Sequence, residues 1–531
     1  MYGNYKKLSK GGINLLNYIL LEIVLSILFI YMHTKIRHGV HMLQLEYYKN
    51  DRYKSWIKKN KKVVFSLRDV LLFIGTIITL INIKVGLIIN IFIGLLLLLA
   101  RNIFKEKKPL VITQRVKRIF TTEVILFLIV SVLTNINILF IILADLLVVM
   151  AYYLVIIINL INKPIETAIS EKFVRKAKKK LRQMDNLKII GITGSYGKTT
   201  TKYIVSTILN QKYNVLKTPA SFNTKMGIVR TINEYMKSTD QIFVCEMGAD
   251  QVGEIKELCN LVHPTIGMIT SIGPQHLETF GSIENIKKTK FELVDSLPDD
   301  GLAFLDYEDE NVKSVNTNKN KITYGLNSSN DYYAENIELT EFGSTFTICT
   351  KAGSKIKVGT KLLGEHNIIN IVGAVAIAKE LGLSDKEIQI GIKMLKPVEH
   401  RLELKQHPNG TIVIDDAYNS NTQGARRAVE VLGRFKNKKK ILVTPGIVEL
   451  GDKAYEYNKI FGMQAAPNCD YAILVGPKQA QPIYDGLIEK NFNKENIFIA
   501  KDFNDAMKKM NEIMDSNTVI LLENDLSDNY L

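Results

Sequence analysis

A glycine-rich segment between a predicted strand and a predicted helix offers the clearest chemistry in this sequence. The apolar run 187–192 leads into Gly194-Ser195-Tyr196-Gly197-Lys198-Thr199 and then into a helical pattern over 200–209. The backbone N–H groups of such a turn, together with the start of the helix, can cradle phosphate oxygens. Lys198 would reach the β- and γ-phosphates, and the Thr199 hydroxyl would bind Mg²⁺. The strict Walker spacing is not met, because Ile192 stands at the first glycine position.

Three further residues are candidates for work on a bound nucleotide. Glu246 ends an apolar strand pattern over 241–246, and a carboxylate at that end of a parallel strand points into a nucleotide crevice. His276 follows a Gly-Pro-Gln turn, and Lys290 lies in a helical pattern fourteen residues later. A single histidine or lysine is usually a loop residue or part of a solvated face. The value of these two therefore depends on their neighbours.

Nine sequence blocks occur in an order that resembles the Mur ligase family. The blocks are 191–202, 221–224, 246–248, 253–255, 272–276, 290–293, 363–367, 397–403 and 414–421. The last of them, Ile-Asp-Asp-Ala-Tyr-Asn-Ser-Asn, is similar to the motif of the family type that adds D-alanyl-D-alanine to a UDP-linked muramoyl tripeptide. The resemblance covers about residues 186–531, and the ordered set is far more specific than the phosphate loop alone.

This resemblance implies an ATP-dependent ligase that forms an amide through an acyl phosphate. Lys198 would stabilise the transferred phosphoryl group, and Thr199 with Glu246 would hold a first Mg²⁺. His276 matches the family's ligand for a second Mg²⁺. Lys290 matches a lysine that the family carbamylates with CO₂, a change that turns a cation into an oxygen ligand suited to Mg²⁺.

The resemblance also implies a wider ATP site that a closing last domain completes. Arg401 is expected to approach the reacting groups from that domain as a fourth catalytic residue beside Lys198, His276 and Lys290. The ATP-binding positions are expected to be Gly194, Ser195, Tyr196, Gly197, Lys198, Thr199, Thr200, Asn367, Asn370, Asp416, Tyr418 and Asn419.

Two features depart from the family pattern. No segment resembles the N-terminal domain that binds the UDP moiety, and Thr422 stands where a proline usually follows Asn421. The first departure leaves the carboxylate donor open between a lipid-linked and a UDP-linked muramoyl peptide. The amine acceptor is expected to be an amino acid or a dipeptide.

The positive charge of the chain lies in its first third. The chain has 69 Lys and Arg against 53 Asp and Glu, a net charge of +16. Residues 1–182 hold 29 Lys and Arg against 9 Asp and Glu, a net charge of +20. Residues 183–531 hold 40 Lys and Arg against 44 Asp and Glu, a net charge of −4. Binding of nucleic acid needs basic residues on the folded reader itself, so this class is excluded. The basic first third fits a membrane surface.

Five apolar segments in this region are expected to span a membrane: 14–32, 69–83, 85–100, 119–134 and 136–161. The basic segments between and after them, 35–62, 101–118 and 163–182, would lie in the cytoplasm. The chain is thus expected to be a multi-pass protein of the cell membrane, in contact with the lipid bilayer, with cytoplasmic catalytic domains. Asp145 would face a partner helix or a cavity.

The sequence predicts an α/β protein of three domains. A helical transmembrane domain covers 1–182, an ATP-binding P-loop domain covers 183–396, and a Rossmann-like C-terminal domain covers 397–531. Short alternating strands in 302–361 indicate a β-rich insertion or edge of the second domain. The four cysteines are scattered without a CxxC pair, which suits a reducing compartment.

Three functions remain open at this point. The preferred one is a membrane-anchored ATP-dependent ligase of peptidoglycan precursors. A synthetase of poly-γ-glutamate or another amino-acid polymer is an alternative, although the 414–421 block favours the muramoyl-peptide type. A membrane regulatory module that binds nucleotide without ligation is another, and it predicts loss of His276 and Lys290, which are both present.

Overall fold

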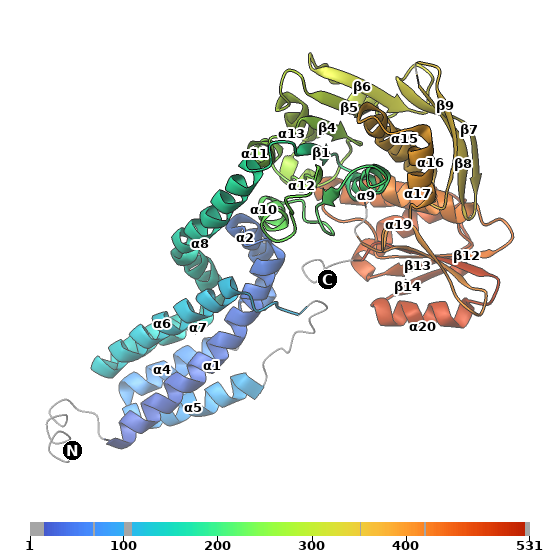
Figure 1. The fold of residues 1–531 in the computed structure, drawn as a ribbon. Helices are drawn as coiled ribbons and strands as arrows, with labels where there is room; N and C mark the ends of the chain where they lie inside the picture. The colour runs from blue at the N-terminus through green and yellow to red at the C-terminus, as the bar shows by residue number, and fades with distance from the viewer. Residues whose placement is uncertain (1–14, 67–68, 100–108, 351, 419–420, 526–531) are drawn as a thin grey trace. The chain divides into compact units, whose positions relative to one another are not determined.

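The computed structural model describes residues 15–66, 69–99, 109–350, 352–418 and 421–525 (Figure 1). The described residues form two compact units, which divide between Ser170 and Glu171. Each unit has its own hydrophobic core.

The first unit is helical. Its elements are α1 (Leu15–Leu45), α2 (Asn50–Lys59), α3 (Lys61–Val64), α4 (Val70–Ile81), α5 (Ile83–Leu99), α6 (Gln114–Ile136), a 3-10 turn (Ile138–Phe140), α7 (Ile141–Val149) and most of α8 (Ala151–Arg182). By length and composition, α1, α6 and α8 could cross a membrane, whereas α4, α5 and 138–149 are shorter apolar helices. Five membrane spans stay a prediction.

Two helix boundaries in this unit differ from the ends of the apolar segments in the sequence. The apolar segment expected to end at residue 32 continues as α1 to Leu45, so much of the predicted loop 35–62 is helical. Lys35, which lies on α1 beyond this apolar run, is buried against Asp69 with 2.7 Å between Nζ and Oδ2, so its charge is paired. The predicted span 136–161 is instead divided at Met150 between α7 and α8.

Polar side chains join the helices of this unit. Asp145 on α7 is buried and accepts a hydrogen bond from the hydroxyl of Thr76 on α4, so it faces a partner helix as expected. Glu123 on α6 is buried and pairs with His33 on α1 at 3.1 Å. Such interhelical contacts favour a defined bundle over a set of independent anchors.

The second unit begins with a nine-stranded sheet. Its strands are β1 (Lys188–Thr193), β2 (Val215–Lys217), β3 (Ile242–Glu246), β4 (Ile266–Ile269), β5 (Leu302–Asp306), β6 (Asn320–Gly325), β7 (Tyr332–Thr340), β8 (Gly343–Thr350) and β9 (Lys355–Thr360). Their order is β2-β3-β1-β4-β5-β6-β7-β8-β9. The pairs are parallel up to β7, while β8 and β9 pair antiparallel. The predicted β-rich insertion therefore extends the nucleotide-binding sheet itself.

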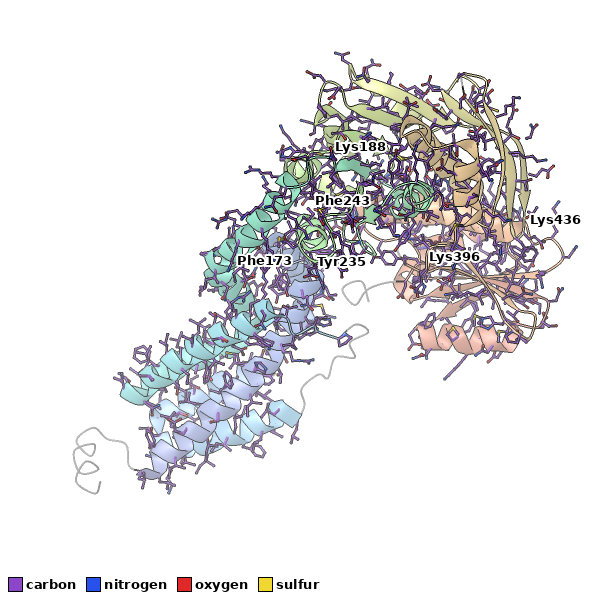
Figure 2. All side chains as sticks on the ribbon, viewed as in Figure 1. Phe173, Lys188, Tyr235, Phe243, Lys396 and Lys436 are labelled. Atoms are coloured by element: carbon purple, nitrogen blue, oxygen red, sulfur yellow. The ribbon has the colours of Figure 1, made fainter. Side chains whose placement is uncertain are left out.

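Helices cover both faces of this sheet. They are α9 (Lys198–Leu209), α10 (Lys225–Glu234), α11 (Glu254–Val262), α12 (Leu277–Phe280), α13 (Ile283–Asp295), α14 (Glu310–Lys313), α15 (Glu365–Glu380) and α16 (Asp385–Lys393). The cluster on one face joins α9 and α15 to the strands. The opposite cluster contains Phe243, labelled in Figure 2, and Ala177 from the end of α8. Burial on both faces explains the continuous apolar strands.

A second, six-stranded sheet ends the chain. It contains β10 (Glu403–Gln406), β11 (Ile412–Asp416), β12 (Lys439–Thr444), β13 (Tyr471–Val475), β14 (Ile497–Ala500) and β15 (Thr518–Glu523), in the order β10-β11-β15-β12-β13-β14. Only β10 is antiparallel among these strands. Its helices are α17 (Thr422–Gly433), α18 (Ala454–Ala465), α19 (Pro477–Glu489) and α20 (Phe503–Ile513). This alternation agrees with the predicted Rossmann-like arrangement.

Candidate active site

The turn after β1 is shaped by two glycines. Gly194 has φ of 150°, and a Cβ there would lie 2.1 Å from the hydroxyl oxygen of Thr270, so a side chain has no room. Gly197 has φ of 78° and stands at the N-cap of α9, a left-handed conformation that favours glycine. The turn therefore brings backbone to the start of α9, where anions bind.

Side chains in this turn have different tasks. Ser195 exchanges 3.0 Å hydrogen bonds with the backbone of Gly273, and Tyr196 is 5% exposed. Both side chains hold the loop in place. The backbone N–H of Ser195 donates to the Ser271 carbonyl at 2.6 Å, so this N–H is not open to the predicted contact with phosphates. Lys198 Nζ lies 2.6 Å from the Gly194 carbonyl oxygen and 2.8 Å from that of Ser195. Burial lowers the pKa of Lys198 to about 8, and the charge of Arg401 contributes to this while Glu246 opposes it.

The predicted ligands of the first Mg²⁺ lie side by side. The Thr199 hydroxyl donates to Glu246 Oε1 at 3.0 Å, and the Asn223 amide donates to the same oxygen at 3.1 Å. Glu246 Oε2 accepts from Lys202 Nζ at 2.8 Å. A hydroxyl and a carboxylate at this position are hard oxygen donors of the kind Mg²⁺ prefers, so the residues fit the ion.

The second predicted metal site is less complete. His276 has φ of 52° and its Nδ1 pairs with the carboxylate of Glu449, which comes from the loop after β12. Lys290 on α13 is 2% exposed. Burial lowers its pKa, and the charge of Lys198 lowers it further. Across the described residues, no three His, Cys, Asp or Glu side chains gather as a metal site. The second Mg²⁺ stays a prediction.

A small pocket adjoins the glycine turn on the side of α15. Its volume is about 90 Å³, and Gly197, Thr200, Asn367 and Asn370 are among its lining residues. Asn367 donates to the Leu363 carbonyl at 2.7 Å, but its Oδ1 is buried with no hydrogen-bond partner, as is Nδ1 of His366. Unpaired buried polar atoms are costly, and the edge of a purine base or a ribose would satisfy them.

Sequence reasoning missed two charged residues of this pocket. Asp306, at the end of β5, and Arg427, on α17, both line it. Burial raises the pKa of Asp306, while the nearby charge of Arg427 opposes that rise. The strand end was a usable signal for Asp306. No sequence pattern marked Arg427 as a pocket residue, because only the fold brings α17 to this pocket.

The C-terminal domain contributes a cluster of polar residues. Asp416 Oδ1 accepts from the backbone N–H of Leu402 at 3.1 Å, and burial raises the pKa of Asp416 to about 6 against the opposing charge of Arg401. The Arg401 guanidinium lies 4.5 Å from the centre of the Tyr418 ring. The Tyr418 and Ser221 hydroxyls lie 2.5 Å apart. Asn419 lies outside the described residues.

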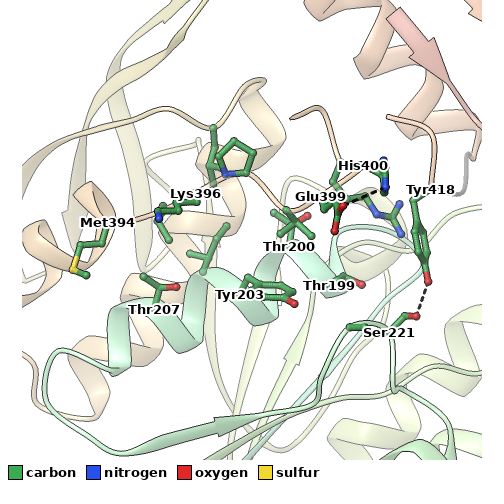
Figure 3. Close-up of a pocket in the computed structure, with 17 residues that line it drawn as sticks. Thr199, Thr200, Tyr203, Thr207, Ser221, Met394, Lys396, Glu399, His400 and Tyr418 are labelled. Atoms are coloured by element: carbon green, nitrogen blue, oxygen red, sulfur yellow. Dashed lines mark hydrogen bonds and ion pairs between the residues drawn. The ribbon is translucent and has the colours of Figure 1, made fainter. Parts of the chain in front are cut away.

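A larger pocket of about 430 Å³ lies on the other side of Thr200 (Figure 3). One wall is a face of α9 with Thr199, Thr200, Tyr203 and Thr207, and the other is the segment 394–401. Thr200 and Arg401 line both pockets. The two pockets thus meet beside the phosphate turn, and the larger one offers room for a substrate next to the nucleotide.

The buried His366 predicts a pH dependence of stability. Burial and the nearby charges of Arg427 and Arg434 lower its pKa to about 3. The unfolded chain binds a proton on this imidazole below about pH 6.5, so stability falls as the pH drops from 6.5 towards 3. At pH 5 the loss should be about 2 kcal/mol. Thermal melts of wild type and His366→Gln at pH 7.5 and 5 measure it. An equal drop in both proteins would contradict the assignment.

Two family profiles match the second unit. Residues 192–378 match the Mur ligase middle domain, and residues 400–523 match the Mur ligase, glutamate ligase domain. These regions contain the phosphate turn, the Glu246 cluster and the Arg401–Asp416 cluster. The resemblance inferred from the ordered blocks is confirmed.

Curated relatives carry a more specific description. The chain is 30% identical over 337 residues to the UDP-N-acetylmuramoyl-tripeptide–D-alanyl-D-alanine ligase of Bacillus subtilis, covering 63% of this chain and 72% of that protein. It is 32% identical over 308 residues to the enzyme of the same description from Escherichia coli, covering 57% and 67%.

Solved structures of the same family are similar to this chain. MurF from Acinetobacter baumannii is similar with a TM-score of 0.60 and 27% identity, over 67% of this chain and 77% of that one. MurF ligase from Thermotoga maritima in complex with ADP has a TM-score of 0.59 and 25% identity, over 67% and 80%.

Proposed function

Because the chain belongs to the Mur ligase family of ATP-dependent, carbon–nitrogen bond-forming ligases, we propose that it adds D-alanyl-D-alanine to a muramoyl tripeptide of peptidoglycan synthesis. The observation that carries the proposal is the Lys198, Thr199 and Glu246 cluster, which lies inside the region 192–378 that matches the Mur ligase middle domain, in a chain 30–32% identical to ligases described by that reaction. ATP and Mg²⁺ are the cofactors of such ligases.

The first step is phosphoryl transfer to the donor. A carboxylate oxygen of the donor attacks the γ-phosphorus of ATP, the bond to the β,γ-bridging oxygen breaks, and ADP leaves. Lys198 would follow the negative charge of the transferred group, and Thr200 and Arg401 would align the donor where the two pockets meet. Mg²⁺, which Thr199 and Glu246 would hold, neutralises phosphate charge when bound.

The second step forms the amide. The acceptor amine attacks the acyl carbon, the carbon–oxygen bond to phosphate breaks, inorganic phosphate leaves, and the amine loses a proton. The larger pocket would exclude water from the acyl phosphate through its buried apolar lining residues Ile204, Leu362 and Leu395. The Tyr418–Ser221 hydrogen bond would hold the C-terminal domain against the loop at 218–224 during this step.

A carbamate on Lys290 is the finer part of the cofactor proposal. The amine would add CO₂ to give a carbamate and one proton, and its oxygens would complete the ligand set around His276. The supporting observations are the burial of Lys290 and the nearby charge of Lys198, which both lower the pKa of Lys290 and so favour the neutral amine that reacts with CO₂.

The membrane part of the proposal rests on the first unit. Three of its helices are long and apolar enough to cross a membrane, and residues 1–182 carry a net charge of +20. The catalytic domains would lie in the cytoplasm. A donor confined to the same membrane has a raised effective concentration near the site, so the enzyme need not bind a UDP group tightly. A lipid-linked muramoyl peptide is therefore proposed as a donor beside the UDP-linked form.

The reaction is tested with the full chain in lipid nanodiscs. ADP release and mass spectrometry of the product are measured with ATP, Mg²⁺, D-alanyl-D-alanine and either UDP-linked or lipid-linked muramoyl tripeptide. We expect an amide product only when donor and dipeptide are both present. Product from glutamate alone would favour the polymer synthetase, and no ligation with any pair would refute the proposal.

The same assay separates the two donors. At equal bulk concentration in nanodiscs, the lipid-linked peptide is expected to give at least a tenfold higher kcat/KM, because both partners share one surface. Equal use of the two donors would reject a membrane-borne substrate and leave the helices as an anchor.

A further inference from the structure

Lys202 is a fully buried lysine that the reaction above does not use. It lies one helical turn after Lys198 on α9 and is 0% exposed, and its ion-pair partner Glu246 is 1% exposed. Lys202 Nζ donates to Glu246 Oε2 at 2.8 Å and also to the carbonyl oxygen of Ala220. Burying a charge is costly unless it is paired and hydrogen-bonded. The buried carboxylate of Glu246 therefore needs a cation at this position.

The lysine completes a fixed ring of donors around one carboxylate. Glu246 Oε1 receives the hydroxyl of Thr199 and the amide of Asn223, and Oε2 receives Lys202. These donors come from α9 and from the loop between β2 and α10. The carboxylate is therefore held from two directions, with Oε1 turned towards Thr199.

A second tie links this ring to the neighbouring loop. Ala220 has a left-handed φ of 40°, and its carbonyl points at Lys202. The same loop carries Asn223, which contacts Glu246, and Ser221, which contacts Tyr418. Lys202 thus connects the carboxylate with the loop that lines the larger pocket.

We propose that Lys202 is the positioning residue that holds Glu246 in its Mg²⁺-binding orientation, and that it sets how strongly nucleotide binding depends on Mg²⁺. The inference rests on the proposed role of Glu246. Partners that orient a metal ligand typically contribute 10- to 100-fold to metal affinity. If the ion pair only stabilised the fold, removing Lys202 would leave the Mg²⁺ dependence unchanged. If the lysine only repelled the metal, removing it would strengthen Mg²⁺ binding relative to wild type.

The test uses Lys202→Met in the full chain, because methionine is unbranched and uncharged. Binding of a non-hydrolysable ATP analogue is measured by calorimetry in EDTA and across a Mg²⁺ titration. We expect affinity in EDTA within about twofold of wild type, since the phosphate turn is intact, and a half-saturating Mg²⁺ concentration raised about 10- to 100-fold. An unchanged or lowered half-saturating concentration would overturn the inference.

A matched control is Lys217→Met. Lys217 is a neighbouring lysine whose Nζ lies 4.8 Å from the Tyr203 ring centre. It is not one of the side chains that donate to Glu246, which are Thr199, Asn223 and Lys202, so its loss should leave the Mg²⁺ titration unchanged. If Lys202→Met does not fold, Lys202→Arg keeps the charge but not the geometry of the amine. It should raise the half-saturating Mg²⁺ concentration severalfold, and a wild-type titration would again overturn the inference.

The outcomes separate this inference from the proposed reaction. Binding is measured without ligation, so a failure to find the substrates leaves the Mg²⁺ titration informative. A wild type whose nucleotide binding ignores Mg²⁺ would refute the role of Glu246 and this inference with it. A wild type that responds to Mg²⁺, with a Lys202→Met variant that responds equally, would refute the inference alone.

Discussion

Replacing Lys198 with alanine is expected to lower the rate of ADP release by about 10²–10³-fold. The ammonium group lies at the phosphate turn, 2.6 Å from the Gly194 carbonyl oxygen, and is the cation placed to follow the transferred phosphoryl group. Its charge would count most in the transition state, so kcat should fall more than the KM for ATP rises. Steady-state ADP release with saturating donor and dipeptide measures the effect.

The control for this variant is Lys225→Ala. Lys225 belongs to the same domain, and its Nζ lies 2.6 Å from Glu257 Oε1 in an ion pair on the surface. Exposed ion pairs contribute little to stability. Its activity should stay within about twofold of wild type. A Lys198→Ala protein with near-normal ligation would refute the assignment of this turn to ATP.

Lys290→Ala is expected to lower ligation by at least about 10²-fold. The side chain is buried beside Lys198, so alanine removes the group proposed to become a carbamate and leaves space for a small acid. Formate or acetate should therefore restore part of the activity. In wild type, ¹³CO₂ should give a carbamate signal that Lys290→Ala lacks.

Lys288→Ala is the matched control on the same helix. Lys288 is exposed, and its removal should change neither activity nor the ¹³C signal. Full activity of Lys290→Ala in CO₂-free buffer would exclude a catalytic role for Lys290. Lost activity without rescue and without a ¹³C signal would exclude the carbamate.

Local sequence patterns determined most of the second unit. The glycine turn, α9 and the strands of both sheets were predictable because each depends on neighbours in the chain: glycines that permit positive φ, apolar runs buried on both faces, and breaks between them. The order of the nine sequence blocks indicated the family, and the family indicated the reaction class. Lys198, Thr199 and Glu246 could be named because each stands at the end of such an element.

Only the tertiary structure decided which distant residues meet. Lys202 with Glu246, Asp306 with Arg427, and His276 with Glu449 are separated by 44 to 173 residues. No local pattern encodes these pairs, because they depend on sheet order and helix packing. Lys35 and Asp69, which form a buried ion pair in the first unit, are a further example. Charge pairing within a folded core is a long-range property, and the sequence reveals it only through the fold.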